Sequence, residues 1–448
     1  MKRPFAGVAL GLILQPLVAL AASEPATHQF TLDNGLKVIV HEDHRAAVVN
    51  TQLWYHVGGS YEPPGQSGIS HALEHMISQG SSKLCPGESA GIYRTLGATE
   101  NAATLNDATI FYQTLPPQAL GVAFEVMADQ MSTAHLSPAI WTTEREIIKS
   151  ERNESVDNDP HQRALELSRR VAFMASASGS PVIGWRHDIE RMQVEELQHW
   201  YRSWYAPNNA TLVIVGDIHL DHVKALATRY FGPIARRELP IVKTPLELEA
   251  PGERSITHYV EHHIPTLTMA FNVPSLNTQT DPRSAPALNL LKELLAGGNS
   301  SAIKAKLIRG DELLLGAATH YSSINRGDEL FSITALLNTK KTTSLSEVKR
   351  RIWAEIEALK TAPPSAEDLE RARTRFIAQD VFNQDDLARH TSFLGKLDNA
   401  GLSWEHHEQR LKALKTITPE DIQHVAQTYF TRDRLTTSYI VTQESHHE

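Results

Sequence analysis

The sequence predicts an α+β protein made of two homologous lobes, each a largely antiparallel sheet flanked by helices. The first observation is length, because 448 residues exceed what a single hydrophobic core usually organises. The second is that strand-like and helix-like runs are mixed without the regular βαβ alternation of a parallel sheet. The third is an internal repeat near the ends of the two halves.

Turn and capping residues place the elements of the first half. Asn34-Gly35 is a strong hairpin signal, and apolar residues alternate on either side of it. Ser137 followed by Pro138 is typical of a helix start. In chain order, we expect two strands within residues 28–43, a strand at 48–58, a helix at about 66–79, a strand at 108–116, and helices at 117–133 and 138–155.

The repeat pairs VEELQHWYRSWYAPNNATLVIV, which begins at Val194, with PEDIQHVAQTYFTRDRLTTSYIV, which begins at Pro419. Both stretches read as an amphipathic helix, a short loop and a strand. Because the order of elements matches as well as the residues, we interpret the repeat as a duplication. It implies two similar lobes of about 200 residues each.

A segment rich in proline and charge, residues 235–255, is typical of an interdomain linker. It divides the chain into domains. We expect a signal peptide at 1–22, a zinc-bearing first lobe at 23–234, the linker, and at 256–448 a second lobe without a zinc site.

The N-terminus has the pattern of a secretory signal peptide. Two basic residues precede an apolar run, and Ala19-Leu20-Ala21 fits a small-residue cleavage site. The alternative is a retained membrane anchor, but the run is short for a membrane span and Gln15-Pro16 interrupts it. No later segment reads as a span. We therefore expect cleavage after about residue 21 or 22 and a periplasmic protein.

Composition excludes some partners and some kinds of site. The chain has 43 Lys and Arg against 52 Asp and Glu, and residues 1–22 hold two of the basic residues and no acidic one, so the mature net charge is −11. This balance disfavours nucleic acid as a partner. Cys85 is the sole cysteine, so no internal disulfide forms, and any metal must be held by histidines and carboxylates.

The stretch GISHALEHMISQG, residues 68–80, holds the candidate site. His71 and His75 are four residues apart, so on a helix they lie on one face, at the spacing with which two imidazoles bind one metal ion. Glu74 shares that side and is placed to accept a proton from a water bound to the metal. Imidazoles without thiols favour Zn²⁺ over softer or harder ions.

A site with two histidines needs a third protein ligand, usually a carboxylate, and leaves a fourth position open. The candidates lie in TTEREIIKSERNESVDNDP. Glu144 and Glu151 are seven residues apart and share a helix face, and Glu154 lies three residues further on. Spacing alone does not choose among these three.

HALEH is the inverted zinc motif His-x-x-Glu-His of the inverzincins. With its flanks YHVGGSYEPPGQSGISHALEHMISQGSS, LGATENAATLNDATIFYQTL and EREIIKSERNES, it resembles the pitrilysin/insulinase family of zinc peptidases, in the short exported bacterial form that is similar to the mitochondrial processing peptidase subunits. The likeness covers nearly the whole mature chain. It implies that Asn101 and Ala102 lie on an edge strand to which a substrate peptide adds as an extra strand.

The resemblance also implies the roles of the acidic residues. Glu151 matches the third zinc ligand, beside His71 and His75. Glu144 matches a carboxylate that supports the site without binding the metal directly. Glu74 matches the general base, which would act on a zinc-bound water and pass the proton to the leaving amine. The implied activity is that of a zinc metalloendopeptidase acting on peptides or small unfolded proteins.

The second lobe departs from the family pattern. Family members that cut unaided carry an Arg/Tyr pair there, which helps to hold the substrate and the oxyanion. In the corresponding stretch this chain offers Phe393, Leu397 and Trp404. Leu290 and Leu294 fall near where the histidines of a second zinc helix would lie. We therefore expect a heterodimer with a related exported chain that carries the pair, with a homodimer as the alternative.

Further histidine groups invite a metal-binding interpretation. Each lies beside a turn or on a polar face without a facing set of carboxylates, so we expect them to be solvated. They are His41 with His44, His262 with His263, and His406 with His407.

Three functions stay open on the sequence. The first is the peptidase described above. The second is a family member with weak or no activity alone, acting as a peptide-binding or partner subunit, which the missing Arg/Tyr pair favours. The third is a non-catalytic periplasmic zinc-binding protein. Glu74 argues against the third, because zinc storage needs no general base.

Overall fold

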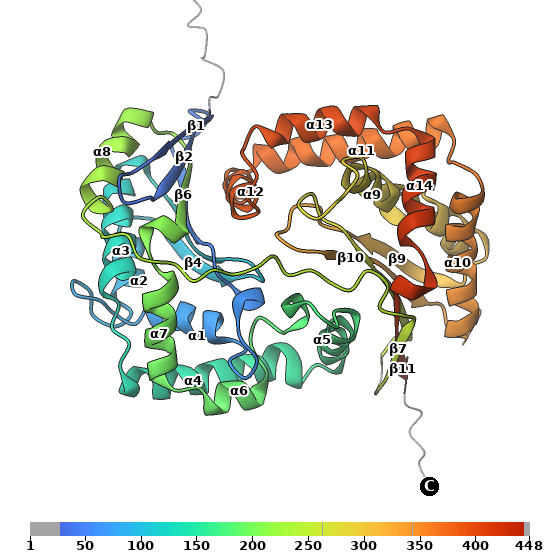
Figure 1. Cartoon of the computed structure of the whole chain (residues 1–448), viewed down its shortest axis with the longest axis horizontal. Helices are drawn as coiled ribbons and strands as arrows, with labels where there is room; N and C mark the ends of the chain where they lie inside the picture. The colour runs from blue at the N-terminus through green and yellow to red at the C-terminus, as the bar shows by residue number, and fades with distance from the viewer. Residues whose placement is uncertain (1–26, 262, 343, 443–448) are drawn as a thin grey trace, which may run out of the picture.

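The computed structural model describes residues 27–261, 263–342 and 344–442 and confirms the predicted α+β fold of two lobes (Figure 1). The predicted signal peptide, residues 1–22, lies outside the described residues. Among the residues that are described, no helix combines the length and the apolar composition that a membrane crossing requires.

The first lobe is built on a six-stranded sheet. Its strands are β1 (Thr27–Thr31), β2 (Lys37–Glu42), β3 (Val49–Tyr55), β4 (Thr99–Thr104), β5 (Thr109–Leu115) and β6 (Ala210–Gly216), in the order β1-β2-β6-β3-β5-β4. Its helices are α1 (Ile69–Ile77), α2 (Glu88–Thr95), α3 (Leu120–Thr133), α4 (Pro138–Arg152), α5 (Pro160–Ala172), α6 (Arg186–Arg191), α7 (Val194–Trp204) and α8 (Leu220–Tyr230). Neighbouring strands are antiparallel except β2 and β6, which are parallel.

The second lobe is built on a five-stranded sheet. Its strands are β7 (Arg254–Val260), β8 (Thr266–Val273), β9 (Leu314–His320), β10 (Glu329–Leu337) and β11 (Leu435–Thr442), in the order β7-β11-β8-β10-β9. Its helices are α9 (Ser284–Lys292), α10 (Leu345–Thr361), α11 (Ala366–Asp385), α12 (Leu387–Asn399), α13 (His406–Thr416) and α14 (Pro419–Tyr429). Short 3-10 turns at Gly59–Tyr61, Pro117–Ala119, Ala177–Gly179, Pro207–Asn209 and Arg432–Arg434, and π-helical turns at Asn153–Asp157, Glu293–Gly297 and Lys304–Gly310, complete the elements.

The two sheets share one topology. Only β7 and β11 are parallel in the second sheet, so β7-β11-β8-β10-β9 repeats the order and the strand senses of β2-β6-β3-β5-β4. Helices α7 and α14 begin at Val194 and Pro419, the two positions that the sequence repeat aligns. The lobes are therefore homologous in fold, as predicted.

The predicted elements of the first half are present with shifted ends. Strands β1 and β2 pair across the Asn34-Gly35 turn, where Gly35 has a φ of 92° that a residue with a side chain rarely adopts. The helix expected at 138–155 is α-helical to Arg152 and continues as the π-helical turn. Helices α2, α5, α6 and α8 were not among the predicted elements.

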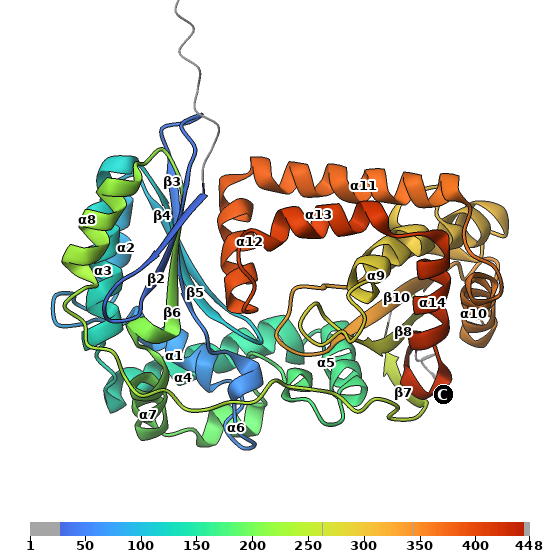
Figure 2. The same ribbon diagram turned by 45° about the horizontal axis from the view of Figure 1, so that its top comes forward.

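Each lobe lends one helix to the sheet of the other. Helix α12 from the second half packs on β3 and β6, where Leu394 joins Trp54 and Val213 in one buried cluster (Figure 2). In the other direction, α5 packs on β7 and β11, with Ala164 against Ile440. Residues 235–253, most of the predicted linker, contain neither helix nor strand and join the two halves.

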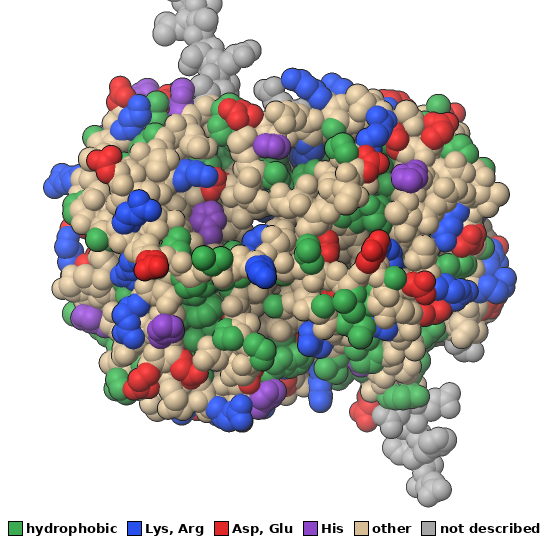
Figure 3. All heavy atoms as spheres, in the orientation of Figure 1, with side chains coloured by type: hydrophobic (Ala, Val, Ile, Leu, Met, Phe, Trp, Pro, Cys, Tyr) green, Lys and Arg blue, Asp and Glu red, His purple; other side chains and the backbone are tan. Residues whose placement is uncertain are grey.

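Charged side chains of both signs are interspersed on the face shown in Figure 3. On that face of the described residues, Lys and Arg form no continuous stripe. This distribution is consistent with the acidic net charge of the chain, −9 with the predicted signal peptide included.

Candidate metal centre and active site

The start of α1 is fixed by glycine packing and by a buried carboxylate. Gly68 precedes the helix with a φ of 84°, and a Cβ there would lie 2.6 Å from the carbonyl oxygen of Ile183. The Glu62 carboxylate accepts hydrogen bonds from the Gly68 and Ser70 amides, at 2.7 and 2.9 Å. Burial raises the pKa of Glu62 to about 7. These contacts set the position of the turn that follows, which carries the histidines.

Helix α1 presents both histidines to one carboxylate on α4. His71 Nε2 lies 3.6 Å and His75 Nε2 lies 3.3 Å from the same oxygen, Glu151 Oε2. Two atoms bound tetrahedrally to one zinc ion, each about 2.1 Å from it, are separated by about 3.4 Å. The three side chains are therefore spaced as ligands of a single ion, and their donor set of two imidazoles and one carboxylate suits zinc.

The three candidate carboxylates, Glu144, Glu151 and Glu154, lie in different positions relative to the histidines of α1. Glu151 faces both histidines, whereas Glu144 is buried behind His75, with its Oε2 3.2 Å from His75 Nδ1. A carboxylate in that position holds the ring proton on Nδ1 and turns the Nε2 lone pair toward the metal position. Glu154 lies exposed in the π-helical turn, outside the cluster. The geometry thus favours Glu151 over the two alternatives as third ligand, a role that stays a prediction.

The electrostatics favour the protonation state that metal binding needs at two of the three residues, His71 and Glu151. At His75, burial lowers the pKa but the hydrogen bonds with Glu151 and Glu144 outweigh it and raise the pKa, so a metal ion would have to displace a proton there. Burial and the neighbouring His75 lower the pKa of His71 to about 4, so this imidazole is neutral near pH 7. The hydrogen bond with His75 holds the pKa of Glu151 below its usual range, so this carboxylate is ionised. The Nδ1 of His71 is buried without a hydrogen-bond partner in the described residues. Its Nε2 is directed at Glu151, so the residues present fit a bound zinc ion.

Glu74 lies beside this cluster with its carboxylate held by the edge strand. Its Oε2 accepts a hydrogen bond of 2.5 Å from the Thr104 hydroxyl on β4. Burial raises the pKa of Glu74 above its usual value, although the Thr104 hydrogen bond and His75 pull it down. A carboxylate with a raised pKa is suited to accept a proton and to release it again.

Strand β4 is an edge strand, as the resemblance implied. It pairs with β5 alone among the described residues, and its Ala102 amide bonds with the side chain of Asn101 at 2.8 Å instead of with β5. The outer edge of β4 therefore carries backbone groups that another extended chain can pair with. Binding of substrate by Asn101 and Ala102 stays a prediction.

The second lobe has no comparable site among the described residues. Both three-residue clusters that are spaced to hold a metal belong to the first lobe. Leu290 and Leu294 are buried in the core of the second lobe. On α12, Leu397 is buried and Phe393 lies partly buried under the Arg410 guanidinium.

One expectation about the other histidines is wrong. His44 does face carboxylates, because it lies against Glu42 and Asp217, and His219 completes a second cluster. Residue 219 comes at the start of α8, far along the chain from residue 44, so no local spacing indicated the contact. His41 instead lies edge-on against the ring of His390. His262 and the side chain of His407 lie outside what the structure describes.

Comparison with protein families identifies the chain. Residues 37–184 match the model of insulinase, peptidase family M16, and residues 191–376 match the M16 inactive domain. The chain belongs to the M16 peptidase family. The zinc-type cluster lies within the first match, and the lobe without one holds most of the second.

Similar M16 proteins include curated zinc proteases and solved structures. The zinc protease PqqE of Helicobacter pylori is 25% identical over 96% of this chain and 98% of its own length. The mitochondrial-processing peptidase subunit beta of Lentinula edodes is 22% identical over 90% of this chain and 88% of its own. A crystal structure of a protease from Helicobacter pylori superposes with a TM-score of 0.85 at 22% identity, covering 93% of this chain and 99% of that one.

A periplasmic protein shares the fold at twice the length. The periplasmic protease PqqL of Escherichia coli superposes with a TM-score of 0.79 at 18% identity, over 93% of this chain and 47% of that one. At this identity the likeness shows the fold alone. The M16 member described here spans about half of that longer protein.

Proposed function

We propose that this M16 protein is a zinc-dependent endopeptidase that hydrolyses peptides or small unfolded proteins in the periplasm. The observation that carries the proposal is the convergence of His71 Nε2 and His75 Nε2 on one Glu151 oxygen, with Glu74 one residue away on the same helix. A zinc store needs the three ligands but not Glu74, whose carboxylate Thr104 holds in place.

Each side chain has a defined task in the proposed reaction. His71, His75 and Glu151 would hold the zinc ion, which when bound supplies the Lewis acidity that activates water and polarises the peptide carbonyl. Glu74 accepts the proton of the attacking water and delivers it to the leaving amine. Glu144 keeps His75 in the orientation and tautomer that direct Nε2 inward.

The outer edge of β4 favours a substrate that binds in an extended conformation. A peptide that pairs with β4 next to Thr104 runs beside Glu74, because these two side chains are in contact. Pairing of this kind needs backbone groups that are not already hydrogen-bonded, so folded proteins are poor substrates. Asn101 would have to release the Ala102 amide for this pairing to extend along the strand.

The test compares the native protein with Glu74→Gln on a mixture of quenched fluorogenic peptides. Gln matches the volume of Glu but cannot take up the proton, so we expect a rate loss of about 10² to 10⁴ with zinc content unchanged. Both proteins are assayed after zinc removal by a chelator and again after zinc is restored. Turnover by Glu74→Gln within about threefold of the native rate would exclude Glu74 as the base.

A second candidate is a member that binds peptide or a partner and cuts weakly by itself. The absence of an Arg/Tyr pair from the stretch that holds Phe393, Leu397 and Trp404 favours it. We propose that a related exported chain with such a pair, or else a second copy of this chain, completes the active enzyme. Zinc binding by the isolated protein together with slow cleavage distinguishes this case from the first.

The proposed location rests on the N-terminal pattern of residues 1–22. The periplasmic location stated for PqqL of Escherichia coli, which shares the fold, agrees with it. Fractionation of cells that produce the full chain, with sequencing of the N-terminus of the product, tests this. A protein in the cytoplasmic fraction that still begins at residue 1 would contradict it.

A further inference from the structure

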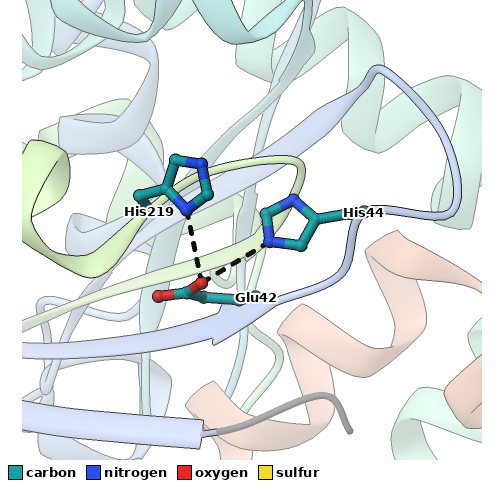
Figure 4. Close-up of side chains that lie close together, drawn as sticks. All are labelled: Glu42, His44 and His219. Atoms are coloured by element: carbon teal, nitrogen blue, oxygen red, sulfur yellow. Dashed lines mark ion pairs between the residues drawn. The ribbon is translucent and has the colours of Figure 1, made fainter. Parts of the chain in front are cut away.

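Glu42, His44 and His219 form a second cluster of the same chemical kind (Figure 4). His44 Nε2 lies 3.5 Å and His219 Nδ1 lies 3.6 Å from one oxygen, Glu42 Oε2. These separations are longer than those of a strong hydrogen bond, about 2.7–3.2 Å. They are close to the roughly 3.4 Å expected between two atoms bound to one tetrahedral zinc ion.

The other polar atoms of His44 and Glu42 already have partners, which leaves the atoms that face the centre of the cluster available. His44 Nδ1 lies 2.7 Å from Asp217 Oδ1, which places the ring proton on Nδ1 and leaves the Nε2 lone pair toward Glu42. Glu42 Oε1 accepts a hydrogen bond of 2.9 Å from the Leu220 amide, so its Oε2 is the oxygen that is left. Asp217 therefore lies against the Nδ1 of His44 in the same way as Glu144 lies against the Nδ1 of His75.

Strand register places this cluster far from the candidate active site. Glu42 pairs with Gly216, which pairs with Val49 at the start of β3. Thr104, which contacts Glu74, belongs to the opposite end of the same sheet, where its partner Thr109 pairs with Tyr55 at the end of β3. The seven residues of β3 separate the two ends by roughly 20 Å.

We propose that Glu42, His44 and His219 bind a second zinc ion, separate from the one that His71, His75 and Glu151 would hold. Two imidazoles and one carboxylate without a thiol are a zinc-type donor set, with the open position taken by water. The ion would join the end of β2 to the turn between β6 and α8. The His219 side chain is 79% exposed, so zinc reaches this site from solvent.

The test measures zinc bound to the untagged full chain by equilibrium dialysis and elemental analysis. The starting variant is His71→Ala/His75→Ala, which removes both imidazoles of the first site. We expect it to retain about one zinc ion per chain. Adding His219→Ala is expected to remove that ion, whereas His222→Ala, a matched change of an exposed histidine in the first turn of α8, leaves it bound.

These changes are mild for the fold, since His219 precedes α8 without making a side-chain cap. In the otherwise native chain, where folding is not in question, His219→Ala is expected to lower the zinc content from about two ions to about one. The proposal is overturned if the His71→Ala/His75→Ala protein is folded but binds no zinc. It is also overturned if His219→Ala and His222→Ala retain equal amounts.

Discussion

Thr104 on β4 donates a hydrogen bond of 2.5 Å to the carboxylate of Glu74 on α1. The contact joins the candidate general base to the edge strand on which a substrate would pair. It also opposes burial, because burial raises the pKa of Glu74 while a hydrogen bond to the ionised form lowers it. We therefore expect the Thr104 hydroxyl, through the pKa of Glu74, to influence the lowest pH at which the protein is active.

We expect Thr104→Val to move the acidic limb of the pH–rate profile to higher pH. The substitution keeps the shape of the side chain but removes the hydroxyl, so the pKa of Glu74 rises further. Because the base works only when ionised, a raised pKa shifts the rise of kcat/KM upward in pH. Thr104→Ser, which retains the hydroxyl, is the control. If the acidic limb does not move in Thr104→Val, the group whose titration produces that limb is not Glu74.

We expect Glu151→Ala to lose most of the bound zinc at the first site. The mutation removes the oxygen that both Nε2 atoms face, and two imidazoles alone leave the ion poorly held. Glu154→Ala is the matched control, because it removes an exposed carboxylate three residues further on. Zinc content is measured in a chain that also carries His219→Ala, so that the second cluster does not contribute. Full zinc content in Glu151→Ala would place the third ligand elsewhere, on Glu144 or Glu154.

How much of the site was predictable depends on the distance between its parts along the chain. His71, Glu74 and His75 lie within five residues, so helical spacing alone placed them together. Glu144 and Glu151 share a helix face, but which of them meets the histidines depends on how α4 crosses α1. Spacing could not decide that.

Contacts between distant segments were beyond the reach of sequence patterns. His219 completes the cluster with His44 only because β6 returns beside β2 in the first sheet. The exchange of α5 and α12 between the lobes depends in the same way on the folded arrangement, as does the contact of Trp54 with Gly395. The duplicated topology was predictable, since the repeat at Val194 and Pro419 records it directly.

We expect Gly395→Ala to lower the free energy of unfolding by about 1–3 kcal/mol. A Cβ on Gly395 of α12 would lie 2.2 Å from Trp54 Cε2 on β3, so the helix must move away from the sheet of the first lobe. Gly91→Ala in α2 is the control, because a Cβ there meets nothing within 4 Å. We expect the control to be neutral or to gain up to about 1 kcal/mol. Urea denaturation measures both, and equal stability would show that α12 accommodates the methyl group.

A peptide-cutting zinc site needs hydrogen-bond donors opposite the metal to hold the substrate and to stabilise the oxyanion. In the second lobe, the positions that correspond to the family's Arg/Tyr pair hold Phe393, Leu397 and Trp404. None of these side chains carries a charged donor. The isolated chain should therefore bind zinc and yet cleave peptides slowly.

We expect the addition of a related exported chain that carries an Arg/Tyr pair to raise the peptidase rate at least about tenfold, a modest part of what one oxyanion donor contributes. The rate is measured at fixed concentration of this chain while the partner is titrated, with the partner's Arg replaced by Ala as the control. Because Glu74 supplies the base in either case, Glu74→Gln must abolish the gain. High activity of the isolated chain, with no gain from the partner and a rate that rises with the square of its own concentration, would show instead that two copies of this chain form the enzyme.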